Sequence, residues 1–325
     1  MADAPATPTL IARARAAFLD ACRLDVETAK PGNVSTASPG HGMTAAQFIA
    51  SAHAAVDALL APGTRVGARV FDAVSRTREV AGCNTNLGIV LLVAPLAAAL
   101  DRLANAPGFD AHAPLSPIAW RAATREILAN LDVDDARAAY RAIALANPGG
   151  LGDAPEQSVH DEPTVDLRAA MLLAAERDSI ARQYANDFAD LFATGLAAIR
   201  EAPAQNPSLA TLNAYLAFLA GWPDSHIVRK HGLALAQSVT LAALEHHMRL
   251  RHALIQRGAR RRAPPTTSLD TWDTQLKARA VNPGTSADLT VATLFVATLC
   301  ALPALASSPS AVPNADQRGD WHGSC

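Results

Sequence analysis

Residues that could carry out chemistry gather in four short segments that interrupt long stretches of helical pattern. Each segment places a glycine near side chains that can bind phosphate, hold a metal ion or accept a proton. The segments are residues 30–33 (with 40–43), 84–88, 224–232 and 282–288. Because a helix start offers unpaired N–H donors to anions, we expect these breaks to fold together around one pocket large enough for a nucleotide.

The first segment contains Lys30, one of three lysines in the chain, followed by a proline, Gly32 and Asn33. A lysine ammonium is a compact point charge suited to phosphate. Lys30 is therefore predicted to contact phosphate, with Gly32 and Asn33 beside it, and the nearby His41 is a candidate general base. The alternative is an ordinary turn between a helix and a loop.

The second segment places three hydrogen-bonding side chains, Asn84, Thr85 and Asn86, directly before an apolar helix. Simple capping needs only one of them, and the partial positive charge of a helix start attracts anions. Capping and ligand binding both remain open as interpretations. Gly88, in the first turn, would allow a ligand or a second helix to approach the backbone closely.

The third segment packs one acid, two histidines and two cations into residues 224–232. Asp224 is either an N-cap or a carboxylate that binds Mg²⁺ or accepts a proton. Arg229 and Lys230 stand just before a glycine and are candidate phosphate contacts. Ser225 and His226, between the acid and the cations, are candidate binding residues.

The fourth segment also has two interpretations. Thr285 and Asp288 have the spacing of a capping box, which would explain them structurally. The alternative assigns Asp288 to Mg²⁺ or to proton transfer, and Ser286 to substrate binding. Asp178 lies on a long amphipathic run and is within reach of such a site, but a surface pair with Arg182 is the expected explanation.

Composition and missing motifs exclude several classes of protein. The formal net charge of −2 argues against a nucleic-acid-binding protein. Four scattered cysteines fit neither a disulfide framework nor a zinc site, so a reducing, cytoplasmic location is expected. The sequence has no GxxxxGK[ST] and no strand-associated GxGxxG, which argues against ordinary P-loop and Rossmann nucleotide binding.

The elements that must position these segments are helices. Alanine is abundant and aromatic residues make up 5% of the chain, which favours an all-α fold. We predict one helical domain over residues 1–306 and a flexible tail over 307–325. Helices are predicted at residues 10–28, 44–61, 66–80, 87–103, 118–131, 134–146, 164–200 (as one helix or two), 209–221, 224–231, 233–256, 269–281 and 286–305.

Two apolar segments resemble membrane helices. Residues 87–100 are 14 in number and contain Pro95, so they are too short to span a bilayer. Residues 289–306 reach the lower limit of about 17–25 residues, but they contain threonines and a proline and have no close basic or aromatic anchors. Both are predicted to be buried core helices, and no membrane partner is expected.

Taken together and in order, the segments resemble the triphosphoribosyl-dephospho-CoA synthase family over about residues 15–300. The similar stretches are Lys30-Pro31-Gly32-Asn33, Gly40-His41-Gly42-Met43, Asn84-Thr85-Asn86-Leu87-Gly88, Asp224-Ser225-His226 and Ser286-Ala287-Asp288-Leu289. Departures from the family pattern fall at Ala29, Ser35, Asn86, Leu87 and Pro283-Gly284-Thr285. The chain therefore resembles a divergent branch of the family.

The resemblance implies an all-helical glycosyltransferase that makes a prosthetic-group precursor. The ribose 2′-hydroxyl of dephospho-CoA would attack C1 of the ATP ribose, adenine would leave, and the triphosphate would be retained. ATP is then a substrate, Mg²⁺ is the implied metal, and the partners are small nucleotides, with an oligomer also compatible. Lys30, Arg229 and Lys230 would bind phosphates, Asp288 or Asp224 would hold Mg²⁺ or act as base, and His41 is the second candidate base.

Two other classes of function fit the same residues. One is an Mg²⁺-dependent helical hydrolase of a ribosyl or phosphoryl substrate, with water as the acceptor. The other is a non-catalytic helical scaffold in which each break is only a capped helix end. A concentration of lysine, histidine and asparagine in separate breaks argues against the scaffold.

Overall fold

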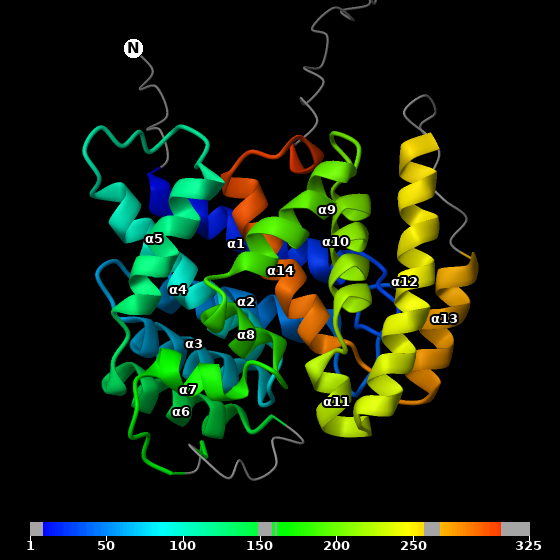
Figure 1. Cartoon of the computed structure of the whole chain (residues 1–325), viewed down its shortest axis with the longest axis horizontal. Helices are drawn as coiled ribbons and strands as arrows, with labels where there is room; N and C mark the ends of the chain where they lie inside the picture. The colour runs from blue at the N-terminus through cyan, green and yellow to red at the C-terminus, as the bar shows by residue number, and fades with distance from the viewer. Residues whose placement is uncertain (1–8, 149–157, 160, 257–266, 307–325) are drawn as a thin grey trace, which may run out of the picture.

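The computed structural model describes residues 9–148, 158–159, 161–256 and 267–306. Every regular element within these ranges is helical, which confirms the predicted all-α class (Figure 1). The predicted tail over 307–325 lies outside the described residues, so that prediction stays untested.

The first six helices agree with the sequence patterns that predicted them. A capping box between Thr44 and Gln47 starts the second of them, and Gly82, in the left-handed conformation, ends the third. The six are α1 (Leu10–Glu27), α2 (Ala45–Leu59), α3 (Val66–Ala81), α4 (Leu87–Ala104), α5 (Pro117–Ala129) and α6 (Val133–Ala146).

The middle of the chain corrects a prediction, because residues 164–200 do not form one or two long helices. Asp178 starts a new helix by accepting hydrogen bonds from two backbone N–H groups, and Asp187 and Phe188 have left-handed backbone conformations. These features interrupt an otherwise continuous amphipathic pattern. The resulting elements are α7 (Leu167–Ala174), α8 (Ser179–Ala185), the π-helical turn η1 (Leu191–Gly195) and α9 (Leu196–Glu201).

The last part of the chain contains the helices that carry the third and fourth segments. Gly232, with a φ of 88°, separates two of them, as its position in the sequence predicted. These elements are α10 (Pro207–Gly221), α11 (Ser225–His231), α12 (Leu233–Gln256), α13 (Thr267–Ala278), α14 (Gly284–Leu299) and the 3₁₀ turn η2 (Pro303–Leu305).

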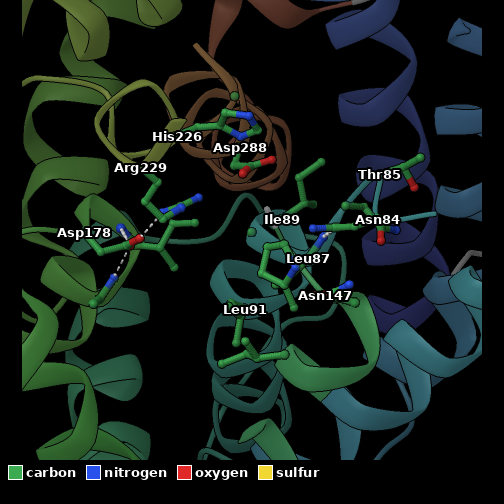
Figure 2. A pocket seen from close by; sticks show the side chains of 18 of the residues that line it. Asn84, Thr85, Leu87, Ile89, Leu91, Asn147, Asp178, His226, Arg229 and Asp288 are labelled. Carbon is green, nitrogen blue, oxygen red and sulfur yellow. Dashed lines mark hydrogen bonds and ion pairs between the residues drawn. The ribbon is translucent and has the colours of Figure 1, made fainter. Parts of the chain in front are cut away.

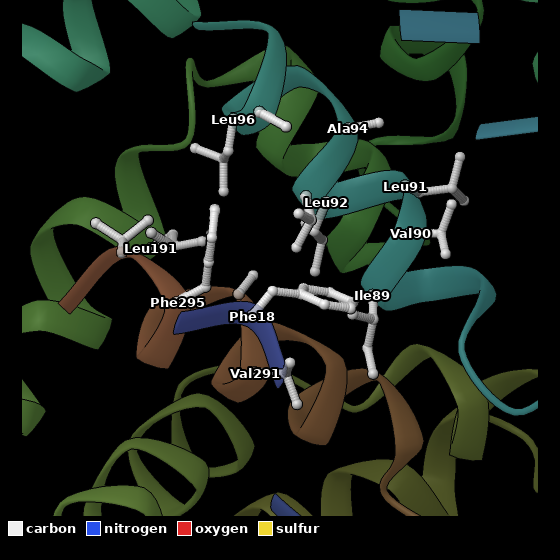
Figure 3. Close-up of a cluster of buried hydrophobic side chains, with 14 of the residues drawn as sticks. Phe18, Ile89, Val90, Leu91, Leu92, Ala94, Leu96, Leu191, Val291 and Phe295 are labelled. Atoms are coloured by element: carbon white, nitrogen blue, oxygen red, sulfur yellow. The ribbon is translucent and has the colours of Figure 1, made fainter. Parts of the chain in front are cut away.

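The main hydrophobic core forms where α14 packs against α1 and α4 (Figure 3). Phe295 of α14 meets Phe18 of α1 edge-to-face at 6.4 Å between ring centroids. Small residues of the alanine-rich helices, such as Ala292 and Ala297, are fully buried there. The prediction of a buried core helix near residue 289 is confirmed, although the helix ends at Leu299, shortly before the left-handed Ala301.

The helix α4 is longer than the apolar segment predicted for it. It has 18 residues, because it continues through Asp101 and Arg102 beyond the apolar run, with Pro95 inside it. By length and composition it is the one helix among the described residues that could cross a membrane, but 78% of its apolar window is buried inside the protein. Burial against α14 and α5 accounts for its apolar character.

A second, smaller core joins α10 to α11, α12 and α13, which lie together at one side of the molecule (Figure 1). Tyr215, Ile227 and Trp272 contribute side chains from three of these helices, and all are buried. This core fixes α11 beside the first turn of α14. The third and fourth polar segments are thereby held next to each other.

Candidate active site

One cavity of about 650 Å³ receives residues from all four polar segments. This volume is within the range of about 300–1,000 Å³ typical of small-molecule sites. The structure therefore brings these segments together, as the sequence predicted (Figure 2). The predicted site residues that line it are Asn33, His41, Asn84, Thr85, Asn86, Gly88, His226, Arg229, Lys230 and Asp288.

The other predicted site residues lie behind the cavity wall and not on its surface. They support the lining residues through hydrogen bonds, ion pairs or close packing. These residues are Lys30, Gly32, Asp224, Ser225 and Ser286.

Asp288 points into the cavity from the first turns of α14 (Figure 2). Among the described residues, no hydrogen bond or ion pair holds its carboxylate. Burial raises the pKa of Asp288 well above its usual value, and the negative charges of Asp25 and Asp224 raise it further. A carboxylate with a raised pKa and no hydrogen-bond partner among the described residues is suited to accept a proton or to bind a cation.

Gly88 explains how Asp288 comes so close to α4. A Cβ at position 88 would lie 2.7 Å from Asp288 Cγ and 2.6 Å from Ile180 Cδ1, which is too close for any side chain. Gly88 was predicted to let either a ligand or a second helix approach the backbone, and the structure shows a second helix, α14, at this position. The absent side chain lets α14 place its carboxylate directly over the start of α4.

Asp224 has the opposite character, because hydrogen bonds occupy both of its oxygens. Oδ1 accepts from the N–H groups of His226 (2.9 Å) and Ile227 (3.2 Å), which confirms the N-cap interpretation. Oδ2 accepts from the N–H (2.7 Å) and the hydroxyl (2.8 Å) of Ser286. Asp224 therefore ties α11 to α14.

The capping-box interpretation of Thr285 and Asp288 is wrong. The helix α14 begins at Gly284 after Pro283, with no side-chain cap, so both residues lie inside its first turns. The hydroxyl oxygen of Thr285 instead accepts a hydrogen bond from the N–H of His226 at 3.2 Å. The early start frees Asp288 from capping.

The predicted surface pair between Asp178 and Arg182 is also wrong. Asp178 caps α8 and forms an ion pair of 2.7 Å with Arg229 at one side of the cavity (Figure 2), while Arg182 pairs with Asp190. The Nε of Arg229 is buried and has no hydrogen-bond partner among the residues that the structure describes. Arg229 thus keeps one donor for a ligand while Asp178 fixes its orientation.

His226 lines the cavity beside these charges. Burial, with the nearby cations Lys230 and Arg229, lowers its pKa to about 3, so the imidazole is neutral at physiological pH. Its Nε2 is buried, and no described residue forms a hydrogen bond with it. A neutral imidazole with an open nitrogen can exchange hydrogen bonds with a bound substrate.

Lys30 does not reach the cavity, because it is fully buried behind it. Its ammonium lies 3.1 Å from Oδ1 of Asp25 and also donates to the Asp25 carbonyl oxygen, and Asp25 itself lines the cavity. Burial lowers the pKa of Lys30, and the charge of Asp25 opposes that shift. Gly32, with a φ of 80°, turns the chain and donates its N–H to Asp273 Oδ1 at 2.8 Å.

His41 sits in a tight turn at the cavity wall, where His41 and Gly42 both have positive φ and Met43 N–H bonds to the Gly40 carbonyl. Its Nε2 lies 2.8 Å from the carbonyl oxygen of Gly32. Because a carbonyl can only accept, that nitrogen carries the hydrogen and Nδ1 keeps its lone pair. Burial lowers the pKa of His41.

The three polar side chains before α4 have different tasks. Asn84 accepts a hydrogen bond from the Leu87 N–H at 3.1 Å, and Thr85 donates to the Ser51 hydroxyl at 2.6 Å. Asn86 is buried, and its amide nitrogen has no hydrogen-bond partner within the described ranges. One residue therefore supports the helix start, while Asn86 presents an unused donor at the cavity.

Three cations on the cavity lining form no ion pair among the described residues: Arg78, Arg177 and Lys230. All three are exposed, so they lie where the cavity meets solvent. Only Lys230 was predicted to act there. Arg78 and Arg177 have no distinctive sequence context that could have identified them.

The fold and the cavity together define a class of protein: an all-α enzyme whose site lies where several helix ends converge. The family described as ATP:dephospho-CoA triphosphoribosyl transferase matches residues 11–306. The chain belongs to this family, and it is a transferase that moves a triphosphoribosyl group onto dephospho-CoA. The hydrolase and scaffold alternatives are therefore set aside.

A solved structure supports the fold assignment. The chain is similar to a crystal structure from Archaeoglobus fulgidus, provisionally described as a triphosphoribosyl-dephospho-CoA synthase, with a TM-score of 0.59 and 22% sequence identity. The match covers 78% of this chain and 100% of that one. No match was found among the curated proteins.

Proposed function

We propose that the cavity binds ATP and dephospho-CoA together and that Asp288 takes the proton of the attacking hydroxyl. The oxygen of the acceptor's ribose 2′-hydroxyl forms a bond to C1 of the ATP ribose, and the bond from C1 to N9 of adenine breaks. Adenine leaves with that electron pair and gains a proton, while the triphosphate stays on the transferred ribose. The hydroxyl proton passes to the Asp288 carboxylate.

A single observation carries this proposal: the same cavity is lined by one carboxylate and three cations that have no ionic partner in the described part of the chain. The cations Arg78, Arg177 and Lys230 offset the charge of a triphosphate. The raised pKa of Asp288 makes its carboxylate a better base than an ordinary aspartate.

The carboxylates around Asp288 also suit the transition state. Departure of adenine leaves positive charge on the ribose ring, as in glycoside hydrolysis. Asp25 and Asp178 line the same cavity, and their charges act on Asp288. Negative charge placed in advance near C1 would stabilise that ring.

If Mg²⁺ binds here through a protein side chain, Asp288 is the carboxylate that fits, and His41 would then take the hydroxyl proton in its place. No residue in the described part of the chain bonds to the oxygens of Asp288, and Mg²⁺ is commonly held by one or two carboxylates together with substrate phosphates. Asp224 does not fit, because four hydrogen bonds occupy its oxygens. The described residues contain no group of three or more ligating side chains, so the substrate's own phosphates would have to complete the coordination. When bound, Mg²⁺ would offset triphosphate charge.

His41 remains the second candidate base. Its Nδ1 is the acceptor nitrogen, and its lowered pKa keeps the ring neutral near pH 7. His226 and Asn86 supply the remaining polar contacts, since each presents a nitrogen that no other described residue binds. These groups would orient the two nucleotides by hydrogen bonds.

The test is incubation of the full chain with ATP, MgCl₂ and dephospho-CoA, followed by separation and mass measurement of the products. We expect free adenine and an acceptor enlarged by a triphosphoribosyl group in equal amounts. Adenine should not accumulate when dephospho-CoA is left out. ADP, or adenine with free ribose triphosphate, would contradict the proposed transfer.

A further inference from the structure

The cavity has a second part whose chemistry differs from the site described above. Side chains from α4, α6, α7 and α8 form an apolar wall, and each is at most 9% exposed. Figure 2 shows Leu91 at the opposite side of the view from Asp288 and His226. The wall consists of Leu91, Tyr140, Ile143, Leu167, Met171 and Ile180.

This wall does not suit the phosphates or the reacting ribose rings. A phosphate moved from water to an apolar surface loses its hydration without gaining partners, which is unfavourable. The buried polar nitrogens that lack a partner among the described residues lie elsewhere on the lining, at Arg229, His226 and Asn86. The unpaired cations Arg78, Arg177 and Lys230 are exposed, where the cavity meets solvent. The apolar wall must therefore contact a different portion of a substrate.

The two substrates differ in one relevant way. Dephospho-CoA consists of an ADP unit extended by a pantetheine arm, which contains methylene groups, a dimethyl carbon, two amides and a thiol. ATP has no such arm. Apolar groups of the arm gain from contact with an apolar wall.

We propose that the apolar wall binds the pantetheine arm and thereby selects dephospho-CoA as acceptor. This inference rests on the proposed function. ATP and ADP also carry a ribose 2′-hydroxyl, so the polar part of the site cannot by itself tell acceptor from donor. A subsite for the arm supplies that discrimination through a portion of the molecule remote from the reacting atoms.

The helix α4 connects the two parts of the cavity. Gly88 lies under Asp288, and Leu91 follows three residues later, about 4.5 Å further along the helix axis. Met171 of α7 and Ile180 of α8 continue the wall from there. An acceptor with its ribose near Asp288 can therefore direct its arm along α4 toward α7.

The test compares dephospho-CoA with ADP, the same nucleotide without the arm, as acceptors at saturating ATP. The variant is Met171→Ala, and the matched control is Leu172→Ala, a neighbouring residue that is 52% exposed and does not line the cavity. Wild type should strongly prefer dephospho-CoA over ADP in kcat/KM. Met171→Ala should lower kcat/KM for dephospho-CoA about tenfold, mainly through KM, because apolar contacts are lost.

The same variant should leave kcat/KM for ADP and the KM for ATP within about twofold, and Leu172→Ala should resemble wild type. Met171→Leu, which keeps the apolar volume, should restore the acceptor preference. Equal losses for both acceptors, or no change for either, would overturn the assignment of this wall to the arm.

A binding measurement separates this proposal from the proposed function. If wild type releases no adenine with either acceptor, the transfer mechanism fails, but calorimetric titration with dephospho-CoA and ADP still tests the subsite. Tighter binding of dephospho-CoA that is reduced by Met171→Ala supports the arm subsite. Equal affinity for the two compounds in wild type contradicts it.

Discussion

Asp224 and Asp288 stand at neighbouring helix starts, on α11 and α14, and the sequence offered both for the same tasks. The structure gives them opposite surroundings. Four donors satisfy Asp224 behind the wall, whereas Asp288 faces the cavity without a partner among the described residues. A buried acid is therefore a poor guide to function until its hydrogen bonds are known.

The pKa values show the same contrast. Burial raises the pKa of both acids, but hydrogen bonds from Ser286 and Ile227 oppose the rise at Asp224. At Asp288 the neighbouring carboxylates add to the effect of burial. Asp224 thus stabilises the arrangement of α11 and α14. The charged form of Asp288, in contrast, is unfavourable, because its carboxylate is buried near other negative charges.

Asp288→Asn should give the largest effect on activity. Loss of the proposed general base should lower kcat by about 10²–10⁴-fold, measured as adenine release. The folded state binds a proton at Asp288 more tightly than the unfolded chain does, so its charged form lowers stability at neutral pH. The Tm at pH 7 should therefore stay the same or rise. A control variant, Asp134→Asn at an exposed surface pair, should behave like wild type.

Asp224→Ala should affect stability first. The substitution removes the acceptor of four hydrogen bonds. Two come from N–H groups of α11, and two come from the N–H and the hydroxyl of Ser286. We expect the free energy of unfolding to fall by about 3 kcal/mol, measured by urea denaturation. Asp166→Ala, which removes a single N-cap bond to Ala169, should cost only about 1 kcal/mol. Equal losses would show that Asp224 is an ordinary cap.

Gly88→Ala should produce a smaller, mixed effect. The added methyl group would push against Asp288 and Ile180, and both sit on packed helices. We expect a stability loss of about 1–3 kcal/mol from overpacking, together with reduced adenine release. Gly221→Ala, at a helix position where an added Cβ meets nothing within 4 Å, serves as the matched control. Unchanged adenine release in Gly88→Ala would show that the close approach of Asp288 to α4 at position 88 is not needed for activity.

Local signals in the sequence predicted most of the helices. The Thr44–Gln47 capping box and Gly82 fixed helix ends, because caps depend on neighbouring residues only. The long run over 164–200 was misjudged, because an amphipathic pattern continues through the left-handed Asp187 and Phe188. The four polar segments could be grouped since their order resembled a known family.

Long-range contacts decided what the sequence could not. The bond between Asp224 and Ser286 joins residues far apart in the chain, and no local pattern shows it. Lys30 could not be recognised as buried, because a distant residue packs against it: its ammonium lies 6.0 Å from the ring centroid of Tyr215 in α10. Met171 has the same apolar character whether its helix faces a core or a cavity, so the apolar wall was missed.

The pH dependence of adenine release, measured for wild type and Asp288→Asn, tests the central claim most directly. If the Asp288 carboxylate takes the hydroxyl proton, wild-type kcat/KM should fall as pH is lowered through a pKa above the ordinary aspartate value of about 3.9. This fall in kcat/KM at low pH should be absent from the slow Asp288→Asn variant. If Asp288→Asn keeps the wild-type rate and the same fall at low pH, another group accepts the proton. His41 is then the first alternative.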